Sequence, residues 1–306
     1  MSDLTDELHK VEGPLSWCPA TLRTEDWLIP APTSASAPRS APTSPPEPEP
    51  HSEDALAARI NAALWYGTGF AVVRGLDLSG LTDRQCVELC AHLAGRVCVP
   101  AGLRLQRSAN ELLTATTAPA LPHTPDDTAP VAPDAHSGDL DLLLPHMDRG
   151  EGPEPPRLLA LLCIQPATEG GASLLASGPA LHEHLATAHP DALRELRQDF
   201  HFGRGPDLDR VRPVFRRTGR TLRVHYNRYW INRGQDEAGT PFTPARRTAL
   251  QRMETLLLDP AMVLTLPLRR GDLLLVNNSA VLHGRTPFMD SGAPGTRRRC
   301  ARIWAD

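Results

Sequence analysis

The chain has 306 residues, which is enough for one large domain or two small ones. Hydrophobic residues make up 41% of it, charged residues make up 22%, and the formal net charge is −4. This composition excludes a wholly disordered chain and a coiled coil. The slightly negative charge also argues against a general nucleic-acid binder, which needs a basic face to neutralise phosphates.

The first 51 residues predict an extension outside the folded domain. The N-terminal ten residues are polar and acidic, so no signal peptide is expected, and no apolar run reaches the ~18 residues of a membrane span. Residues 30–50 contain eight prolines and no hydrophobe larger than alanine, a composition typical of a flexible linker. Trp17 and Trp27 precede this linker, and they either dock on the domain or belong to an unstructured tail.

The folded domain is predicted to span residues 52–306 and to start with a helix over 52–67, a strand over 69–76 and a helix over 81–95. Cys86 and Cys90 lie four residues apart in the second helix and therefore share a face. Core packing explains them better than metal binding. The six cysteines include no CxxC pair, so reduced structural thiols and a cytoplasmic location are expected.

The remainder of the chain alternates short strand-like runs with two helical stretches. Residues near 100–140 lack large hydrophobes over much of their length and predict a lid-like insertion. Many short strands with covering helices favour a β-sandwich or an open barrel. The expected strands are 157–165, 221–231, 263–268, 272–278 and 299–305, and the expected helices are 179–200 and 243–259.

Candidate metal ligands stand at the ends of two of these runs. His146 and Asp148 follow the run that begins at Leu142, and in an extended chain residues i and i+2 point to the same side. His283 follows a second apolar run far downstream. Two histidines and one carboxylate form the facial triad of non-haem Fe(II) oxygenases, which leaves positions open for a co-substrate and oxygen.

Two arginines on the closing strand suggest an anion site. Arg298 and Arg302 are four residues apart and share a face if the segment is extended. A guanidinium inside a barrel is costly unless it meets an anion, and its planar fork matches a carboxylate.

The combined motifs resemble the iron- and 2-oxoglutarate-dependent dioxygenases of the taurine dioxygenase and clavaminate synthase type, over roughly residues 55–306. The pattern of that family appears here in order as His146-Met147-Asp148, Gly170-Gly171-Ala172-Ser173, His283-Gly284-Arg285-Thr286 and Arg297-Arg298-Arg299. The resemblance implies a double-stranded β-helix, or jelly roll, with covering helices in an α+β, mostly β, chain.

The same resemblance implies the role of each site residue. His146, Asp148 and His283 would hold Fe(II), and Arg298 would bind the distal carboxylate of 2-oxoglutarate. Ser173 stands where the family usually has a threonine that donates to that carboxylate. Arg302 stands where relatives bind an anionic group of the substrate.

The implied reaction uses O2 and 2-oxoglutarate to hydroxylate an unactivated C–H bond of a small, anionic, carboxylate-bearing metabolite such as an amino acid. The same iron chemistry can also end in desaturation or ring closure. Two competing hypotheses are a non-catalytic β-helix that binds or senses a small acid and a zinc hydrolase with the same ligands. Because no proposed site residue precedes His146, we expect removal of residues 1–50 to leave iron binding and basal turnover largely unchanged, unless Trp17 and Trp27 pack over the active-site mouth as part of a lid.

Additional polar clusters carry weaker hypotheses. His182 and His184 are expected to be exposed on a helix, where i and i+2 diverge and do not favour a zinc site. Asn227, in the predicted strand 221–231, is a candidate substrate contact, although cross-strand packing also explains it. Asn277 and Asn278, which stand next to the distal ligand in the sequence, are either hydrogen-bond donors that support the metal site or caps of the strand end.

Overall fold

The structure is a computed structural model, and it describes residues 13–32, 53–97, 107–114, 141–150, 152, 154–203, 210–219, 221–290 and 296–305. The proline-rich linker lies almost wholly outside the described residues. So does most of the lid-like insertion predicted near 100–140, but residues 107–114 within it form a strand of the main sheet, so that part is not an insertion in the described fold.

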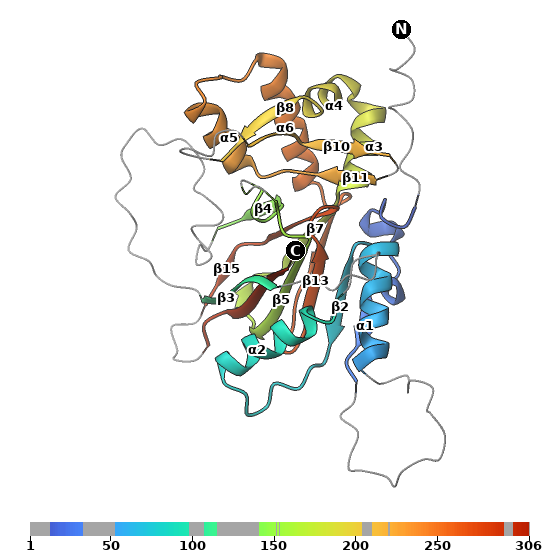
Figure 1. Ribbon diagram of the computed structural model, residues 1–306, viewed down its shortest axis with the longest axis vertical. Coiled ribbons are helices and arrows are strands. Elements are labelled where there is room, and N and C mark those ends of the chain that lie inside the picture. Colours follow the sequence, from blue (N-terminus) through green and yellow to red (C-terminus); the bar gives the residue numbers. More distant parts are fainter. Residues whose placement is uncertain are drawn as a thin grey trace.

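A six-stranded sheet forms one wall of the fold (Figure 1). All its strand pairs are antiparallel except the parallel pair of the first two strands. Its central strands are nearly continuous apolar runs because both faces of the sheet are covered. In spatial order the strands are β1 (Leu28–Pro30), β2 (Phe70–Arg74), β13 (Leu273–Asn277), β5 (Leu158–Gln165), β16 (Arg299–Ala305) and β3 (Arg107–Thr114).

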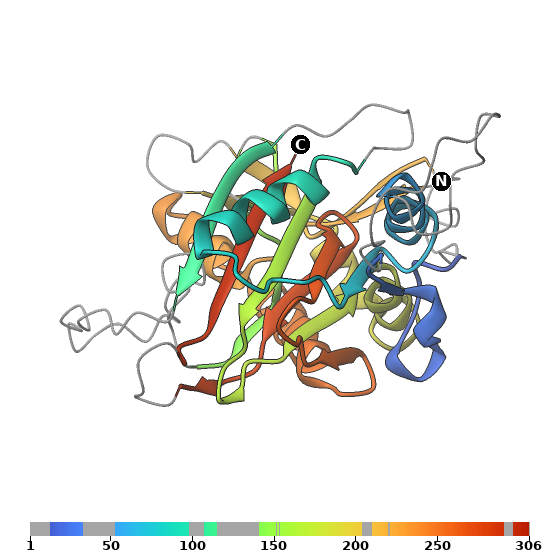
Figure 2. The same cartoon turned by 90° about the horizontal axis from the view of Figure 1, so that it is seen from below.

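A four-stranded antiparallel sheet forms the facing wall, in the order β12 (Val263–Leu266), β7 (Ser173–Ser177), β14 (Val281–Arg285) and β4 (Leu143–His146). One buried apolar cluster joins the two sheets, with Phe70 and Leu274 from the main sheet against Leu175 and Val281 from the facing sheet. This packing, seen from below in Figure 2, confirms the predicted jelly-roll core with covering helices.

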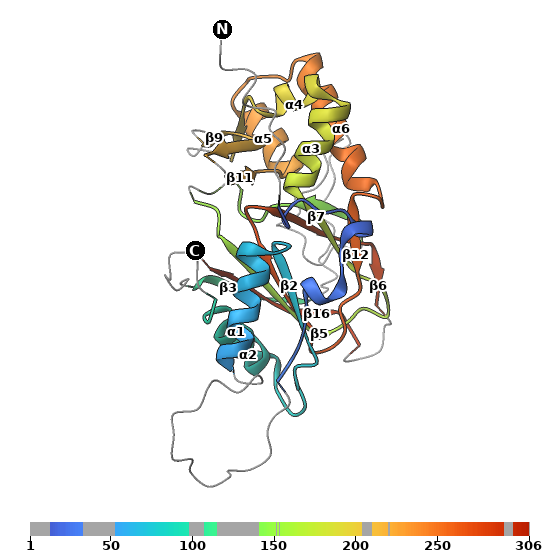
Figure 3. The same cartoon turned by 90° about the vertical axis from the view of Figure 1, so that its right-hand side faces the viewer.

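Two helices cover the outer face of the main sheet, α1 (Glu53–Asn61) and α2 (Asp83–Ala94), and a π-helical turn (Ala62–Tyr66) follows α1. Figure 3 shows both helices beside the sheet. Cys86 and Cys90 of α2 are fully buried in the cluster that α2 makes with β5 and β16. Their predicted role in core packing is confirmed.

A helical unit with its own core lies between β7 and β12 in the chain and occupies the top of Figure 1. Its apolar cluster includes Leu181, Phe200, Trp230 and Met253. The unit contains α3 (Gly178–Ala188), α4 (Pro190–Leu196), β8 (Asp199–Phe202), β9 (Arg210–Pro213), β10 (Phe215–Thr218), β11 (Thr221–Val224), α5 (Arg228–Glu237) and α6 (Pro244–Leu258). A short antiparallel pair, β6 (Glu169–Gly170) with β15 (Phe288–Met289), extends the jelly roll where β7 begins and β14 ends.

Two predicted elements differ from the structure. The strand expected over 221–231 ends at Val224, and α5 begins at Arg228, because the side chain of Asn227 caps the helix by accepting the Trp230 N–H. The single helix expected over 179–200 breaks at Pro190, whose ring cannot continue the hydrogen-bond ladder of α3.

The described part of the N-terminal segment packs on the domain, so the predicted boundary at residue 52 is wrong for residues 13–32. Strand β1 pairs with β2, and the Trp17 indole N–H donates to the Thr68 carbonyl oxygen at 2.6 Å. Trp17 also contacts the Phe70 ring, with centroids 5.3 Å apart. Removal of residues 1–50 would therefore also remove β1 and the Trp17 contacts, which the expected dispensability of this segment did not consider.

Within the described residues, the structure contains no helix that is both long enough and apolar enough to cross a membrane.

Candidate metal centre

The two predicted histidine ligands lie opposite each other on neighbouring strands. His146 on β4 pairs in register with His283 on β14, and their ring centroids are 4.9 Å apart. His146 Nδ1 lies 2.9 Å from the Leu144 carbonyl oxygen, a contact that requires the proton on Nδ1. That tautomer leaves the lone pair of His146 Nε2 available to a metal ion.

Asp148 completes the cluster from the turn that follows β4. Its Oδ1 atom lies 3.3 Å from His146 Nε2 and 3.4 Å from His283 Nε2. One ligand atom from each residue lies within 4.8 Å of the other two, and no second group of three such residues occurs in the described part of the chain. The sequence pattern therefore predicted correctly that these three side chains lie together.

The residues present fit a divalent metal ion. Asp148 is fully buried, and its Oδ1 has no hydrogen-bond partner among the described residues. Leaving a buried carboxylate oxygen unpartnered is costly unless a cation meets it. Two imidazoles and one carboxylate form the donor set that suits non-haem iron.

The protonation states also favour metal binding. Burial opposes ionisation of Asp148, but the charges of His283 and Arg302 and the proximity of both histidine rings hold its pKa well below the usual range. Burial lowers the pKa of His283 despite the attraction of Asp148. An ionised carboxylate beside a neutral imidazole is the form in which these groups bind a metal.

Asn278 fixes the backbone of the metal-binding turn. Its Oδ1 accepts the Asp148 N–H at 3.0 Å, and its Nδ2 donates to the Asp148 carbonyl oxygen at 3.1 Å. Asn277 instead caps the strand end, since its Oδ1 accepts from the N–H and hydroxyl of Ser279. The two interpretations that the sequence left open therefore each apply to one of these residues.

The second oxygen of Asp148 has partners that the sequence analysis missed. The Trp304 indole N–H donates to Oδ2 at 2.8 Å, and the Arg302 guanidinium lies 3.6 Å from the same atom. Arg149 lies over the Trp304 ring, with its Cζ 4.3 Å from the centroid. Strand periodicity could have identified Trp304, because it shares a face of β16 with Arg302, whereas nothing in the sequence pointed to Arg149.

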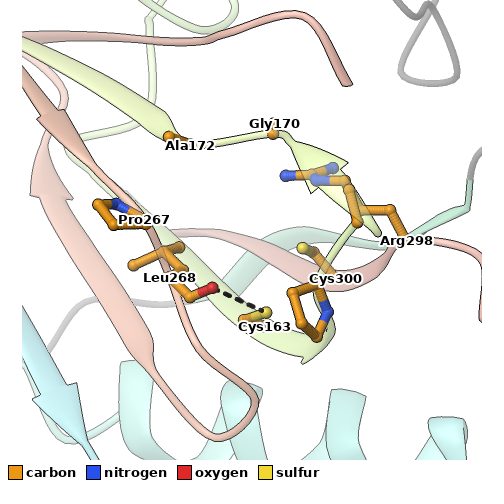
Figure 4. Close-up of a pocket in the computed structure, with 10 residues that line it drawn as sticks. Cys163, Gly170, Ala172, Pro267, Leu268, Arg298 and Cys300 are labelled. Carbon is orange, nitrogen blue, oxygen red and sulfur yellow. Dashed lines mark hydrogen bonds between the residues drawn. The ribbon is translucent and has the colours of Figure 1, made fainter. Parts of the chain in front are cut away.

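The predicted co-substrate residues lie farther along the jelly roll. Arg298 is buried just before β16, with its Cζ 5.5 Å from the Phe288 ring centroid. Ser173 is buried at the start of β7 and directly follows Ala172, which lines the same small cavity as Arg298. Figure 4 shows the guanidinium of Arg298 reaching towards Gly170 in this cavity of about 30 Å³.

Two thiols share this cavity with Arg298. Cys163 and Cys300 are cross-strand partners on β5 and β16, and Cys163 Sγ donates to the Leu268 carbonyl oxygen at 3.8 Å (Figure 4). The neighbouring Cys163 thiol and the charges of nearby arginines outweigh burial and lower the pKa of Cys300 to about 6. These arginines are Arg298, Arg285 and Arg302. The positive charge of these arginines around the cavity favours an anion.

The two candidate substrate residues have structural contacts. Arg302 meets Asp148 and also stacks on Trp304, with its Cζ 4.4 Å from the ring centroid. Asn227 is fully buried, and its Nδ2 lies 3.5 Å from the Met147 carbonyl oxygen while its Oδ1 caps α5. Asn227 thus supports the backbone between the candidate ligands His146 and Asp148.

His182 does not lie where the sequence predicted. It is 3% exposed rather than solvated, its ring meets the edge of Phe215, and burial lowers its pKa to about 4. His184 is exposed as expected. Helix α3 turns one face to the apolar core of the helical unit, which is why residues two apart have opposite environments.

Comparison with known proteins agrees with this arrangement. A uridine-5'-phosphate dioxygenase from Streptomyces sp is 33% identical over 140 residues, covering 42% of this chain and 49% of the relative. The taurine hydroxylase-like protein SAT17 from Stachybotrys chartarum (strain CBS 109288 / IBT 7711) is 27% identical over 181 residues, covering 55% of this chain and 43% of the relative. The chain thus spans about half the length of the curated relatives it matches.

A solved structure with the same fold is the non-haem iron oxygenase OrfP in complex with Fe and alpha-ketoglutaric acid. It is 14% identical, has a TM-score of 0.55, and covers 82% of this chain and 78% of its own. The family model for the taurine catabolism dioxygenase TauD, TfdA family matches residues 33–304. Because this match spans most of the sequence, the chain belongs to the TauD, TfdA family of dioxygenases.

Proposed function

We propose that the protein is an Fe(II)- and 2-oxoglutarate-dependent oxygenase that hydroxylates a small anionic metabolite. One observation carries the proposal: the buried Asp148 Oδ1 faces two histidine Nε2 atoms and has no hydrogen-bond partner among the described residues. Membership of the dioxygenase family supports the same conclusion.

His146, Asp148 and His283 would hold the iron. When bound, Fe(II) supplies the oxidation of an unactivated C–H bond, driven by O2 and by the decarboxylation of 2-oxoglutarate to succinate. The chain keeps the ligands in their binding forms by burial and by the Leu144 and Asn278 hydrogen bonds. Because Asp148 occupies the carboxylate position, no additional site is open for a halide, which favours hydroxylation over halogenation.

Arg298 would bind the distal carboxylate of 2-oxoglutarate, with Ser173 as a second donor. A guanidinium offers a carboxylate two parallel hydrogen bonds, which fix its direction as well as its affinity. Arg285 is buried as well, and its Cζ lies 4.4 Å from the Phe288 ring that Arg298 also faces, so positive charge is concentrated beside the cavity.

The substrate is proposed to be a small molecule with an acidic group. Arg302 lies beside the ligand carboxylate, where a substrate anion would meet its guanidinium. The names of the relatives agree with this class, because uridine 5'-phosphate carries a phosphate and taurine carries a sulfonate.

The test is an anaerobic loading with Fe(II) and 2-oxoglutarate, followed by an oxygen pulse in the presence of candidate amino acids, sulfonates and nucleoside monophosphates. The expected result is substrate-dependent succinate together with a product heavier by one oxygen atom. A product lacking two hydrogens would instead indicate desaturation or ring closure. Binding of 2-oxoglutarate without any succinate would favour a non-catalytic sensor.

A further inference from the structure

The two oxygens of Asp148 have different surroundings. Oδ1 faces the two histidine Nε2 atoms, whereas Oδ2 accepts the Trp304 indole N–H at 2.8 Å. Trp304 is 4% exposed, and its partner carboxylate is fully buried. The contact is therefore a buried hydrogen bond to a charged acceptor, a class stronger than hydrogen bonds between neutral groups.

Two guanidinium groups hold the indole in place. The Cζ atoms of Arg149 and Arg302 lie 4.3 Å and 4.4 Å from the Trp304 ring centroid, within the range of cation–π attraction. Arg149 directly follows Asp148. Its φ is 55°, and no other non-glycine residue in the described backbone has a positive φ. Such a conformation persists where its surroundings compensate for it, and here it lets Arg149 reach the indole.

We propose that Trp304 is a positioning residue that restricts Asp148 to one metal-binding oxygen. This inference rests on the proposed function. A carboxylate can bind a cation through one oxygen or both, and a second Asp148 oxygen on the iron would compete with 2-oxoglutarate for an open position. The Trp304 N–H keeps Oδ2 occupied and turned away from the histidines.

The choice of a tryptophan has a chemical reason. An indole N–H is a neutral donor with no acceptor capacity, so an incoming carboxylate or phosphate has little tendency to draw it away from Asp148. Arg302, the other partner of Oδ2, carries a charge that such an anion attracts. Trp304 would therefore maintain the orientation of Asp148 while Arg302 responds to substrate.

Trp304→Phe tests the proposal because it removes the N–H and keeps an aromatic ring. Trp17→Phe is the matched control, since Trp17 is equally buried and its N–H donates to a backbone oxygen away from the cluster. Under anaerobic conditions, each variant is titrated with Co(II) as a redox-stable probe and then with 2-oxoglutarate, with the Co(II) absorption spectrum reporting both steps.

For Trp304→Phe we expect one bound Co(II) per chain with an affinity within about threefold of wild type. We expect 2-oxoglutarate affinity to fall about tenfold, at the lower end of what a lost hydrogen bond to a charged group costs. The Co(II) spectrum before 2-oxoglutarate addition should also change, because the ligand set changes. Trp17→Phe should match wild type in both affinities and in its spectrum. A general structural defect would weaken both binding steps together.

Arg149→Gly provides a second test if Trp304→Phe does not fold. Glycine adopts positive φ without strain, so this exposed position should tolerate it while the indole loses a stacking partner. A smaller loss of 2-oxoglutarate affinity, about threefold, is expected from the modest strength of a cation–π contact.

The proposal is overturned if the variant that folds keeps wild-type 2-oxoglutarate affinity and spectrum, or loses Co(II) and 2-oxoglutarate affinity in parallel. Absence of Co(II) or 2-oxoglutarate binding in the wild-type protein would instead contradict the proposed function.

Discussion

Buried or half-buried histidines occur in two regions of this molecule with opposite consequences. In the jelly roll, His146 and His283 converge on the unpartnered oxygen of Asp148. In the helical unit, His182 and His225 are also buried, and burial lowers the pKa of each to about 4.

The difference lies in what the imidazoles face. Burial makes a histidine neutral in both regions, so neutrality alone does not define a site. Arginines lie near His182 and His225 and lower their pKa further, whereas a carboxylate lies between His146 and His283. A metal site requires convergence of neutral imidazoles on an anion, and only the jelly roll provides it among the described residues.

The largest expected effect is that of Asp148→Ala. Removing the carboxylate eliminates the anion on which the histidines converge, so we expect metal binding to fall from one equivalent to none and succinate formation to stop. Metal content after dialysis and succinate release measure these outcomes, and circular dichroism checks the fold. The matched variant His182→Leu should retain one metal equivalent. Full succinate formation by Asp148→Ala would show that the ligand assignment is wrong.

Arg298→Leu should have the next largest effect. It removes a bidentate, charge-assisted contact, so we expect a loss of roughly 2–5 kcal/mol of 2-oxoglutarate binding. The loss should appear mainly as a raised KM for 2-oxoglutarate with little change in metal stoichiometry. An unchanged KM would transfer the role to a neighbouring arginine such as Arg285, which is also buried near the cavity.

The helical-unit histidines predict acid sensitivity. Their folded pKa of about 4 lies below the unfolded value of ~6.5, so between these values the unfolded chain binds more protons and stability falls as the pH drops. At pH 5 each histidine should destabilise the fold by about 2 kcal/mol relative to pH 7. In urea unfolding, His182→Leu should lose about 2 kcal/mol less than wild type over this pH range. Identical pH dependence in both proteins would show that His182 does not contribute to the acid sensitivity.

The smallest effect is expected at Ser173. Ser173→Ala removes one hydroxyl donor near Arg298, which should cost about 1 kcal/mol of 2-oxoglutarate binding. Ser173→Thr keeps the hydroxyl and should retain wild-type KM. If alanine and threonine behave alike, the hydroxyl does not contact the co-substrate.

The grouping of the candidate metal ligands was predictable because short, local patterns mark them, whereas the jelly roll was predicted from the resemblance to the dioxygenase family. The HxD pair and the distal histidine each follow a short, continuous apolar run that is typical of a buried strand. Strand alternation placed Arg298 and Arg302 on one face, and the resemblance to the family supplied the role proposed for Arg298.

Features that depend on contacts between distant segments were not predictable. Asn227 caps a helix inside a stretch rich in aromatic residues that resembles a strand, so local propensity gave the wrong element. The position of Trp17 depends on its contact with Phe70, which is distant in the sequence. His182 is buried because other elements of the helical unit, such as the strand that carries Phe215, pack against α3. The position of the Arg149 side chain depends on a positive φ that no residue pattern in the sequence predicts.

The central claim is that these three ligands hold iron for 2-oxoglutarate turnover. The most direct test compares succinate formation by the same protein reconstituted with Fe(II) and with Zn(II), at equal metal occupancy, in the presence of O2. We predict succinate with Fe(II) and none with Zn(II). Equal succinate with both metals, or none with Fe(II) when 2-oxoglutarate is bound and a range of small anionic substrates is supplied, would contradict the claim.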